Sequence, residues 1–162
     1  MKKIILFALF VINICAGLYA DNIFILTAGI EDKVFKDNQN VRDAVMALES
    51  GAMDVYFESG HIISNFGLHH IDAGDALKAA KNAGCSYLML IEPVFADQDD
   101  FSIKSIDYSY VNTISEDILF SDKLETFERT DNRKLEDIYI ELGSNMAWAC
   151  IRSNKTLSAQ NF

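Results

Sequence analysis

The stretch SYLMLIEPVF, residues Ser86–Phe95, is the most hydrophobic segment of the chain after its first twenty residues. A short, continuous apolar run of this kind predicts a strand buried in the middle of a sheet. Pro93, the only proline in the chain, lies near the end of the run, where its missing N–H costs least. The segments on either side therefore have to supply the neighbouring strands and the helices that cover them.

A strand and a long helix are predicted on the N-terminal side of this run. Residues Ile23–Ile30 are rich in β-branched and apolar side chains and predict a strand, whereas the polar residues 31–40 predict a loop. Gly60 is placed to end the following helix in a left-handed turn. That helix is predicted from apolar residues that recur three and four positions apart, namely Val41, Val45, Leu48, Ala52 and Val55. We expect it to be well buried, because its apolar surface is widened by Met46, Met53 and Phe57.

A short strand over residues 61–65 and a second helix lead into the central run. Asp72 can cap the start of this helix and Gly84 can end it. Its helical repeat consists of Ala76, Leu77, Ala80 and Ala83.

Two strands and a last helix are predicted after the central run. Asp97–Asp100 form a turn, and the apolar alternation changes phase between Ser105 and Ile106, which indicates a β-bulge. Residues 118–127 return as a partner strand. Apolar residues at helical spacing then predict a helix over about residues 132–151.

The element order β-α-β-α-β-β-β-α predicts an α+β fold, an α/β sandwich with a mixed sheet and helices packed on it. We assign residues 21–151 to a single domain. The polar residues 152–162 are expected to form a flexible C-terminal tail.

The first twenty residues have the pattern of a secretory signal peptide. Lys2 and Lys3 supply positive charge, an apolar run follows, and Ala20 is a small residue before the polar Asp21. A membrane anchor is the alternative, but this run is shorter than the roughly 20 apolar residues of a spanning helix and contains Asn13. We expect an exported bacterial protein of the periplasm or envelope, with no transmembrane span after cleavage.

Cys15 leaves a lipid anchor as a further alternative. A bacterial lipoprotein is cut just before a cysteine that then carries the lipid. Ile14 is not the small residue normally found at that position, and the apolar run continues past the cysteine. We therefore expect Cys15 to belong to the signal peptide.

The net charge narrows the range of partners. The formal charge of −10 becomes −12 once the first twenty residues, which contain Lys2 and Lys3 and no acidic residue, are removed. Such a chain repels phosphate backbones, so nucleic acid is not expected as a partner.

Cys85 and Cys150 could form one disulfide in an exported protein. Their apolar neighbourhoods equally favour buried free thiols.

The approach to the central strand resembles a pattern found in envelope proteins. A helix with small and apolar residues, Leu48–Met53, ends at Ser59–Gly60, and a second helix ends in Asn82–Gly84 before the strand. This arrangement resembles the α/β domain shared by the penicillin-binding-protein activator LpoB, the curli secretion factor CsgG and the N-terminal domain of TolB. The resemblance covers about residues 23–151. It implies an envelope protein that binds other proteins or assembles, and it carries no catalytic motif.

One group of residues offers a candidate metal site. His69, His70 and Asp72 supply imidazole and carboxylate ligands of the kind that zinc accepts. Adjacent histidines cannot easily reach one ion, however, so a solvated loop is the favoured interpretation. Asp97–Asp100 lacks the spacing of a calcium-binding EF-hand loop and is better explained as a charged turn.

Four aromatic residues are candidates for an interaction surface. Tyr108 and Tyr110 share one side of a predicted strand, and the last helix carries Tyr139 and Trp148. Aromatic residues are common in strand cores, which favours a buried position for the first two. A partner surface is the alternative, because tyrosine and tryptophan are enriched at interfaces.

These observations favour an envelope module that binds a protein partner or self-associates, with no cofactor. The alternative is a small exported hydrolase or metal-dependent enzyme that uses His69, His70 and the nearby aspartates. Capture of a ligand in a pocket beside the sheet is a third possibility. The sequence has neither a Gly-x-Ser-x-Gly nucleophile turn nor a glycine-rich phosphate loop.

Overall fold

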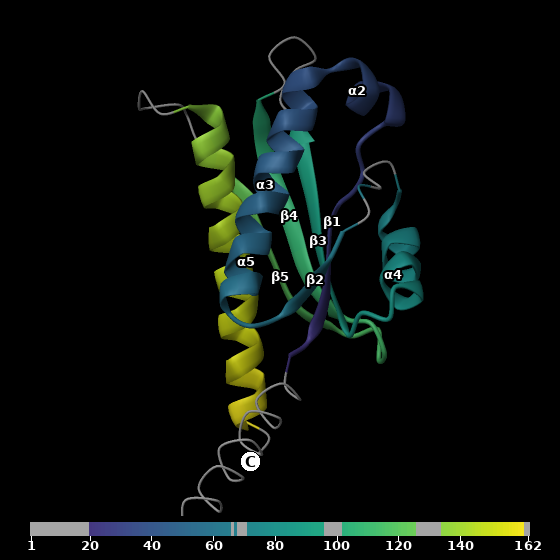
Figure 1. Cartoon of the computed structure of the whole chain (residues 1–162), viewed down its shortest axis with the longest axis vertical. Helices are drawn as coiled ribbons and strands as arrows, with labels where there is room; N and C mark the ends of the chain where they lie inside the picture. The colour runs from purple at the N-terminus through teal and green to yellow at the C-terminus, as the bar shows by residue number, and fades with distance from the viewer. Residues whose placement is uncertain (1–19, 66, 68–70, 96–101, 126–133, 161–162) are drawn as a thin grey trace, which may run out of the picture.

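The computed structural model describes residues 20–65, 67, 71–95, 102–125 and 134–160 (Figure 1). Residues 1–19 of the predicted signal peptide, including Cys15, lie outside these residues. The elements follow the order β1 Asn22–Thr27, α2 Asp32–Asp37, α3 Gln39–Glu58, β2 Ile62–Ser64, α4 Ala73–Asn82, β3 Tyr87–Phe95, β4 Ile103–Asn112, β5 Ile118–Glu125 and α5 Leu135–Gln160.

The five strands form one mixed sheet in the order β2-β1-β3-β4-β5. β1 runs parallel to β2 and β3, whereas β3, β4 and β5 are antiparallel neighbours. The hydrophobic run therefore forms the central strand β3, and its residues Leu88–Ile91 are buried. The predicted α+β fold with a mixed sheet is confirmed.

Helices cover the two faces of the sheet unequally. α3 and α5 lie side by side over one face, and α4 alone packs on the other (Figure 1). Strand alternation separates the two cores. Ile25 and Met89 belong to the core under α3 and α5, whereas Leu26 and Leu90 belong to the core under α4.

Two glycines allow α3 and α5 to approach at backbone distance. A Cβ atom on Gly51 would lie closer than 3.0 Å to the carbonyl oxygen of Ile140, and one on Gly143 equally close to that of Leu48. The Ser144 hydroxyl donates across this crossing to the Gly51 carbonyl oxygen at 3.1 Å. Any side chain at either glycine would force the helices apart.

Local signals in the sequence placed several helix ends and one bulge correctly. Gly60 and Gly84 adopt positive φ angles of 85° and 70° at the ends of α3 and α4. The Asp72 carboxylate caps α4 by accepting from the Asp75 backbone N–H at 2.8 Å. The register of β3 against β4 shifts between Val94, which pairs with Ser105, and Phe95, which pairs with Ile103, next to the predicted change of phase.

Two predicted boundaries were wrong. Residues 31–40 contain α2 and the start of α3, because the Arg42 guanidinium donates to the carbonyl oxygens of Phe35 and Lys36 at the end of α2. α5 continues past Ile151 to Gln160, so the expected tail begins inside the helix. Its polar C-terminal turns lack the apolar repeat from which the helix was predicted.

The optional disulfide does not form in this structure. Cys85 and Cys150 are both free and buried. Cys85 belongs to the core under α4, and Cys150 belongs to the core under α3 and α5. The sheet between the two cores keeps the thiols apart.

We predict that Gly51→Ala and Gly143→Ala each lower the free energy of unfolding by about 1–3 kcal/mol or more, because the added methyl group has no space. Gly74→Ala in α4 is the matched control, since its Cβ would meet nothing closer than 3.4 Å. The control should gain up to about 1 kcal/mol from helix propensity. Urea denaturation measures all three, and a neutral Gly143→Ala would show that the helices cross elsewhere.

Candidate interaction surface

The outer side of α3 carries exposed apolar side chains. Met46 and Phe57 are 61% and 74% exposed, and Met53 is partly buried. The expectation that they would bury this helix more deeply was wrong. The stripe Val41–Val55 already covers the sheet, and Gly51 contacts α5 at the helix crossing. Spacings of seven and four residues place Met46, Met53 and Phe57 together on the remaining, outer side of α3.

α5 adds a tryptophan on its own outer side. Trp148, the only tryptophan of the chain, is 41% exposed. It follows Ile140 and Ser144 at intervals of four residues along one side of α5, and both of these residues approach Gly51 of α3. Trp148 therefore lies on the outer side of α5, about two turns beyond Ile140.

A shallow groove joins the two helices near their N-terminal ends. Its volume is about 570 Å³, and Met46 and Ser50 of α3 face Leu135 and Ile140 of α5 across it. Leu135 is also exposed. We call the surface formed by Met46, Met53, Phe57, Leu135, Ile140 and Trp148 the outer helical face.

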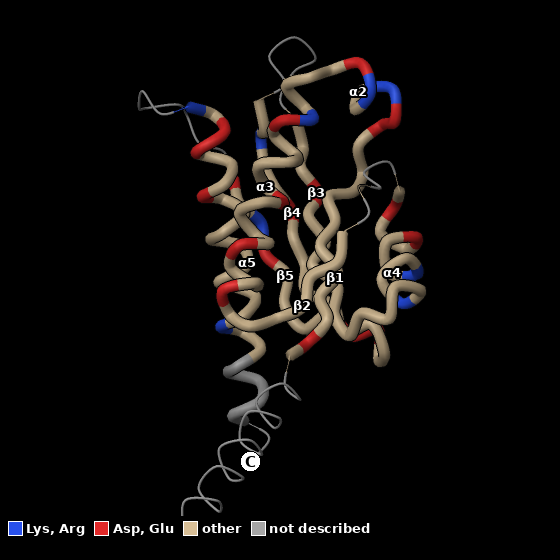
Figure 2. The backbone as a smooth tube through the Cα atoms, in the orientation of Figure 1, with Lys and Arg blue, Asp and Glu red and all other residues tan. Residues whose placement is uncertain are grey.

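Charge around the outer helical face is mostly negative. Acidic residues outnumber basic ones along both α3 and α5 (Figure 2). Asp43 and Glu136 line the groove itself, and Asp54 and Glu58 are exposed on α3. This rim favours a partner with neutral or basic groups around its own apolar contact.

Three of the four aromatic candidates for an interaction surface are buried, which is the position that the sequence favoured for Tyr108 and Tyr110. Tyr108, Tyr110 and Tyr139 are 4%, 2% and 8% exposed. The Tyr110 ring lies between two others, with centroids 6.3 Å from Tyr56 and 5.1 Å from Tyr87. Strand alternation points Tyr108 and Tyr110 toward α3 and α5, and Tyr139 of α5 belongs to the same core. All three stabilise the core, and Trp148 alone of the four offers a large exposed area.

The tyrosine core contains no activated nucleophile among its described groups. Burial raises the pKa of the Cys150 thiol to about 12, so the thiol stays protonated at neutral pH. Burial likewise raises the pKa of Tyr56 and of Tyr110 far above the usual tyrosine value. These groups serve packing in this structure.

A buried carboxylate that the sequence did not single out ties α3 to the sheet. Glu49 is 4% exposed and accepts from the Thr27 backbone N–H at 2.9 Å and from the Asn65 side chain at 2.8 Å. β1 pairs with the short strand β2 only as far as Phe24. The backbone N–H of Thr27, farther along β1, therefore has no partner from β2. Glu49 supplies that acceptor and holds the segment after β2.

The candidate metal ligands His69 and His70 lie outside the described residues. Asp72, the third candidate, uses one carboxylate oxygen to cap α4. Within the described ranges no group of three or more His, Cys, Asp or Glu side chains is placed to hold a metal ion. In the same parts of the chain, no helix is both long and apolar enough to cross a membrane.

Comparison with solved structures finds the same fold in other bacterial proteins. PelC from Paraburkholderia phytofirmans matches with a TM-score of 0.50 and 12% identity over 78% of this chain and 84% of PelC. A Helicobacter pylori protein described as a homologue of the neuraminyllactose-binding hemagglutinin matches with a TM-score of 0.50 and 14% identity, over 88% of this chain and 91% of that one. TolB from Acinetobacter baumannii gives a TM-score of 0.47 and 12% identity, over 82% of this chain and 28% of TolB.

These similarities concern the fold alone. No protein-family model and no curated protein sequence matches the chain. The β-α-β-α-β-β-β-α arrangement is therefore shared with PelC and the Helicobacter protein, while the residues of the outer helical face have to be judged from their own geometry.

We predict that the substitution of methionine by alanine changes the free energy of unfolding unequally at an exposed and at a buried position. Met46→Ala should change the free energy of unfolding by no more than about 0.5 kcal/mol, because the side chain is mostly in solvent. Met146→Ala, at a position that is 0% exposed, should cost about 2–5 kcal/mol. Equal losses in urea denaturation would show that Met46 is buried in the free protein.

Proposed function

We propose that this chain is an exported module of the bacterial envelope that binds another protein through the outer helical face and catalyses no reaction. The single observation that carries the proposal is the exposure of Met46, Phe57 and Trp148 on neighbouring helices. Exposed large apolar side chains that gather on one surface are typical of interaction sites. Aromatic residues and methionine are the residue types enriched in interface cores.

Export is supported by the N-terminal pattern of charge, apolar run and small residue. Solved proteins with this fold include PelC, which forms a dodecamer. Self-association is therefore one form that the proposed binding could take. The acidic rim supports a different partner, because two copies meeting through the same face would bring Asp54 and Glu58 of each close together.

The test replaces three exposed apolar side chains of this face by the polar residue glutamine. Met46→Gln, Phe57→Gln and Trp148→Gln are combined in one variant, and Val94→Thr, at an apolar position of β3 that is 45% exposed, is the matched control. Both proteins should unfold within about 0.5 kcal/mol per substitution of the unmodified chain. They should differ in binding.

Immobilised protein is incubated with solubilised envelope fractions, and sedimentation velocity follows self-association in parallel. We expect one specific protein, or further copies of the chain, to bind the unmodified protein and the Val94→Thr control. The triple variant should lose that binding by at least about tenfold, since interface anchors commonly contribute more than 1 kcal/mol each. Equal binding by the triple variant would contradict the proposal.

A further inference from the structure

Among the described residues, α4 is the one helix that packs on the face of the sheet opposite the outer helical face. α4 packs on β1 and β3, where its Ala76 and Ala80 join the core. Beside α4 lies a groove of about 690 Å³ with Ala73, Gly74 and Leu77 of the helix on one side. Its floor is formed by β3, β4 and β5.

Strand register arranges the floor of this groove in three rows across the sheet. Each row contains one residue from each of the three strands, and all nine residues line the groove. The first row is apolar, the second contains two small hydroxyl residues and the third is charged. In this order the rows consist of Leu88, Val111 and Ile118; of Leu90, Ser109 and Ser121; and of Glu92, Asp107 and Lys123.

The charged row carries more negative than positive charge. The Lys123 ammonium lies 3.8 Å from an Asp107 carboxylate oxygen, and both side chains are about half exposed. Glu92 faces Asp107 directly across the strands and forms no ion pair with any described residue. Partial burial and, next, the Asp107 charge raise the pKa of Glu92. A cation placed between the two carboxylates would relieve this repulsion.

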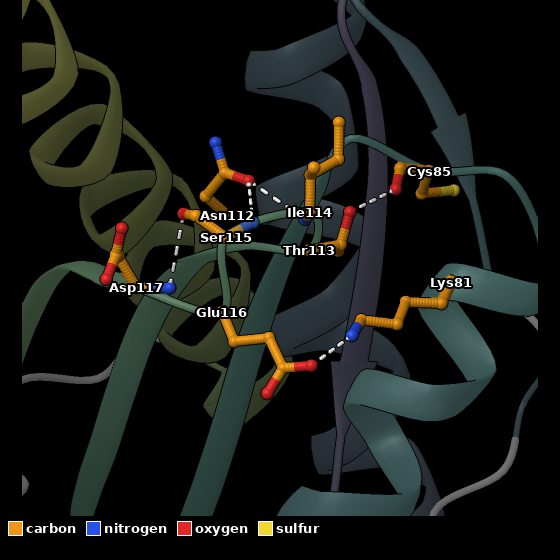
Figure 3. A network of polar contacts seen from close by, with 8 residues as sticks. All are labelled: Lys81, Cys85, Asn112, Thr113, Ile114, Ser115, Glu116 and Asp117. Carbon is orange, nitrogen blue, oxygen red and sulfur yellow. Dashed lines mark hydrogen bonds and ion pairs between the residues drawn. The ribbon is translucent and has the colours of Figure 1, made fainter.

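The apolar end of the groove is bounded by the β4–β5 turn, which several polar contacts hold in place (Figure 3). Lys81 of α4 forms an ion pair with Glu116, and the Thr113 hydroxyl donates to the Cys85 carbonyl oxygen at 2.5 Å. The Asn112 side chain accepts from the backbone N–H groups of residues 114 and 115. The Lys81 ammonium neutralises the Glu116 charge, and these contacts together hold the turn in one conformation in the free protein.

We propose that this groove binds an extended segment of a partner protein that presents an apolar residue, a small residue two positions later and a lysine or arginine two positions after that. Rows two residues apart along a strand are about 7 Å apart, so the apolar and charged rows lie about 13 Å apart. In an extended segment, residues one, three and five point to the same side and cover the same distance. The occupant therefore matches the floor row by row.

Lysine and arginine suit the lining better than a small cation would. Their aliphatic stems pack on apolar side chains such as Leu77 and Leu90 while the charged head reaches a carboxylate. A peptide also pairs its apolar first residue with the row of Leu88, Val111 and Ile118, which a free amine leaves uncovered. This proposal does not depend on the outer helical face, which lies on the opposite side of the sheet.

The test is an NMR titration of the ¹⁵N-labelled protein with three capped five-residue peptides. The first has leucine at position one, serine at three, lysine at five and threonine elsewhere. The second has glutamate in place of the lysine, and the third has the lysine at position two. We expect the first peptide to shift amide signals of β3, β4 and β5 around the three rows. The other two should bind at least about threefold more weakly, in line with the contribution of an exposed ion pair.

Protein variants separate the groove from general attraction to an acidic chain. Glu92→Gln and Asp107→Asn should each weaken the first peptide by at least about threefold, and Lys123→Ala should strengthen it by removing a competing cation. Asp54→Asn on α3 removes one negative charge outside the groove and should change nothing. Equal binding of all three peptides, or equal weakening by Asp54→Asn, would overturn the proposal. If Asp107→Asn does not fold, Glu92→Gln alone tests the role of the charged row.

The dependence on pH follows from the charged row. Asp107 on β4 and Lys123 on β5 share the row of Glu92, and Asp122 of β5 and Glu116 of the β4–β5 turn also line the groove. The groove-lining residues of α4 carry no charge. Because the pKa of Glu92 is raised above 4.5, its carboxylate gains a proton before an ordinary glutamate does as the pH falls. Binding of the first peptide should weaken over that range in the unmodified protein. Glu92→Gln should show little change there, and an identical pH profile for both proteins would contradict the role of Glu92.

Discussion

The close backbone approach of α3 and α5, with Gly51 against Ile140 and Gly143 against Leu48, sets the rotation of α3, and most of the molecule depends on that rotation. With Gly51 against α5, the stripe from Val41 to Val55 faces the sheet. Glu49, two residues before Gly51, reaches the backbone N–H of Thr27. The remaining side, with Met46 and Phe57, is left in solvent. One close approach of two helices thus accounts for the core, for a buried carboxylate and for an exposed apolar face.

Strand alternation gives the central sheet two different roles. On one face, Met89 of β3 and Tyr110 of β4 pack under α3 and α5 and support the helices that carry the outer helical face. On the other face, Glu92 and Asp107 of the same two strands line the groove beside α4. Within residues 87–94 of β3 and 106–112 of β4, before the register shift, a substitution therefore acts on one face or the other according to whether its position is odd or even. This separation allows the two proposed binding surfaces to be tested independently.

Much of the fold could be predicted from local patterns in the sequence. The apolar run Ser86–Phe95 identified the central strand, and glycines at positions 60 and 84 marked helix ends because only a positive φ angle suits those turns. The change of phase at Ser105 and Ile106 revealed the bulge. In each case the signal lies within a few residues of the feature that it predicts.

The surfaces could not be predicted in this way, because they depend on contacts between distant segments. Met46 and Phe57 look like core residues until the Gly51 contact shows which side of α3 is already occupied. Glu92, Asp107 and Lys123 become neighbours only through strand register, although a glutamate inside the hydrophobic run of β3 was a signal that could have been noticed. The short helix α2 was missed because its end depends on the side chain of Arg42.

The most direct test of the central claim, that the outer helical face binds a protein, is photocross-linking in intact cells with benzoylphenylalanine at position 57. The same photoreactive residue at position 94, another exposed apolar position, serves as the control. The account predicts one discrete cross-linked product from position 57 that is absent from position 94. No product at position 57, or the same products from both positions, would contradict it.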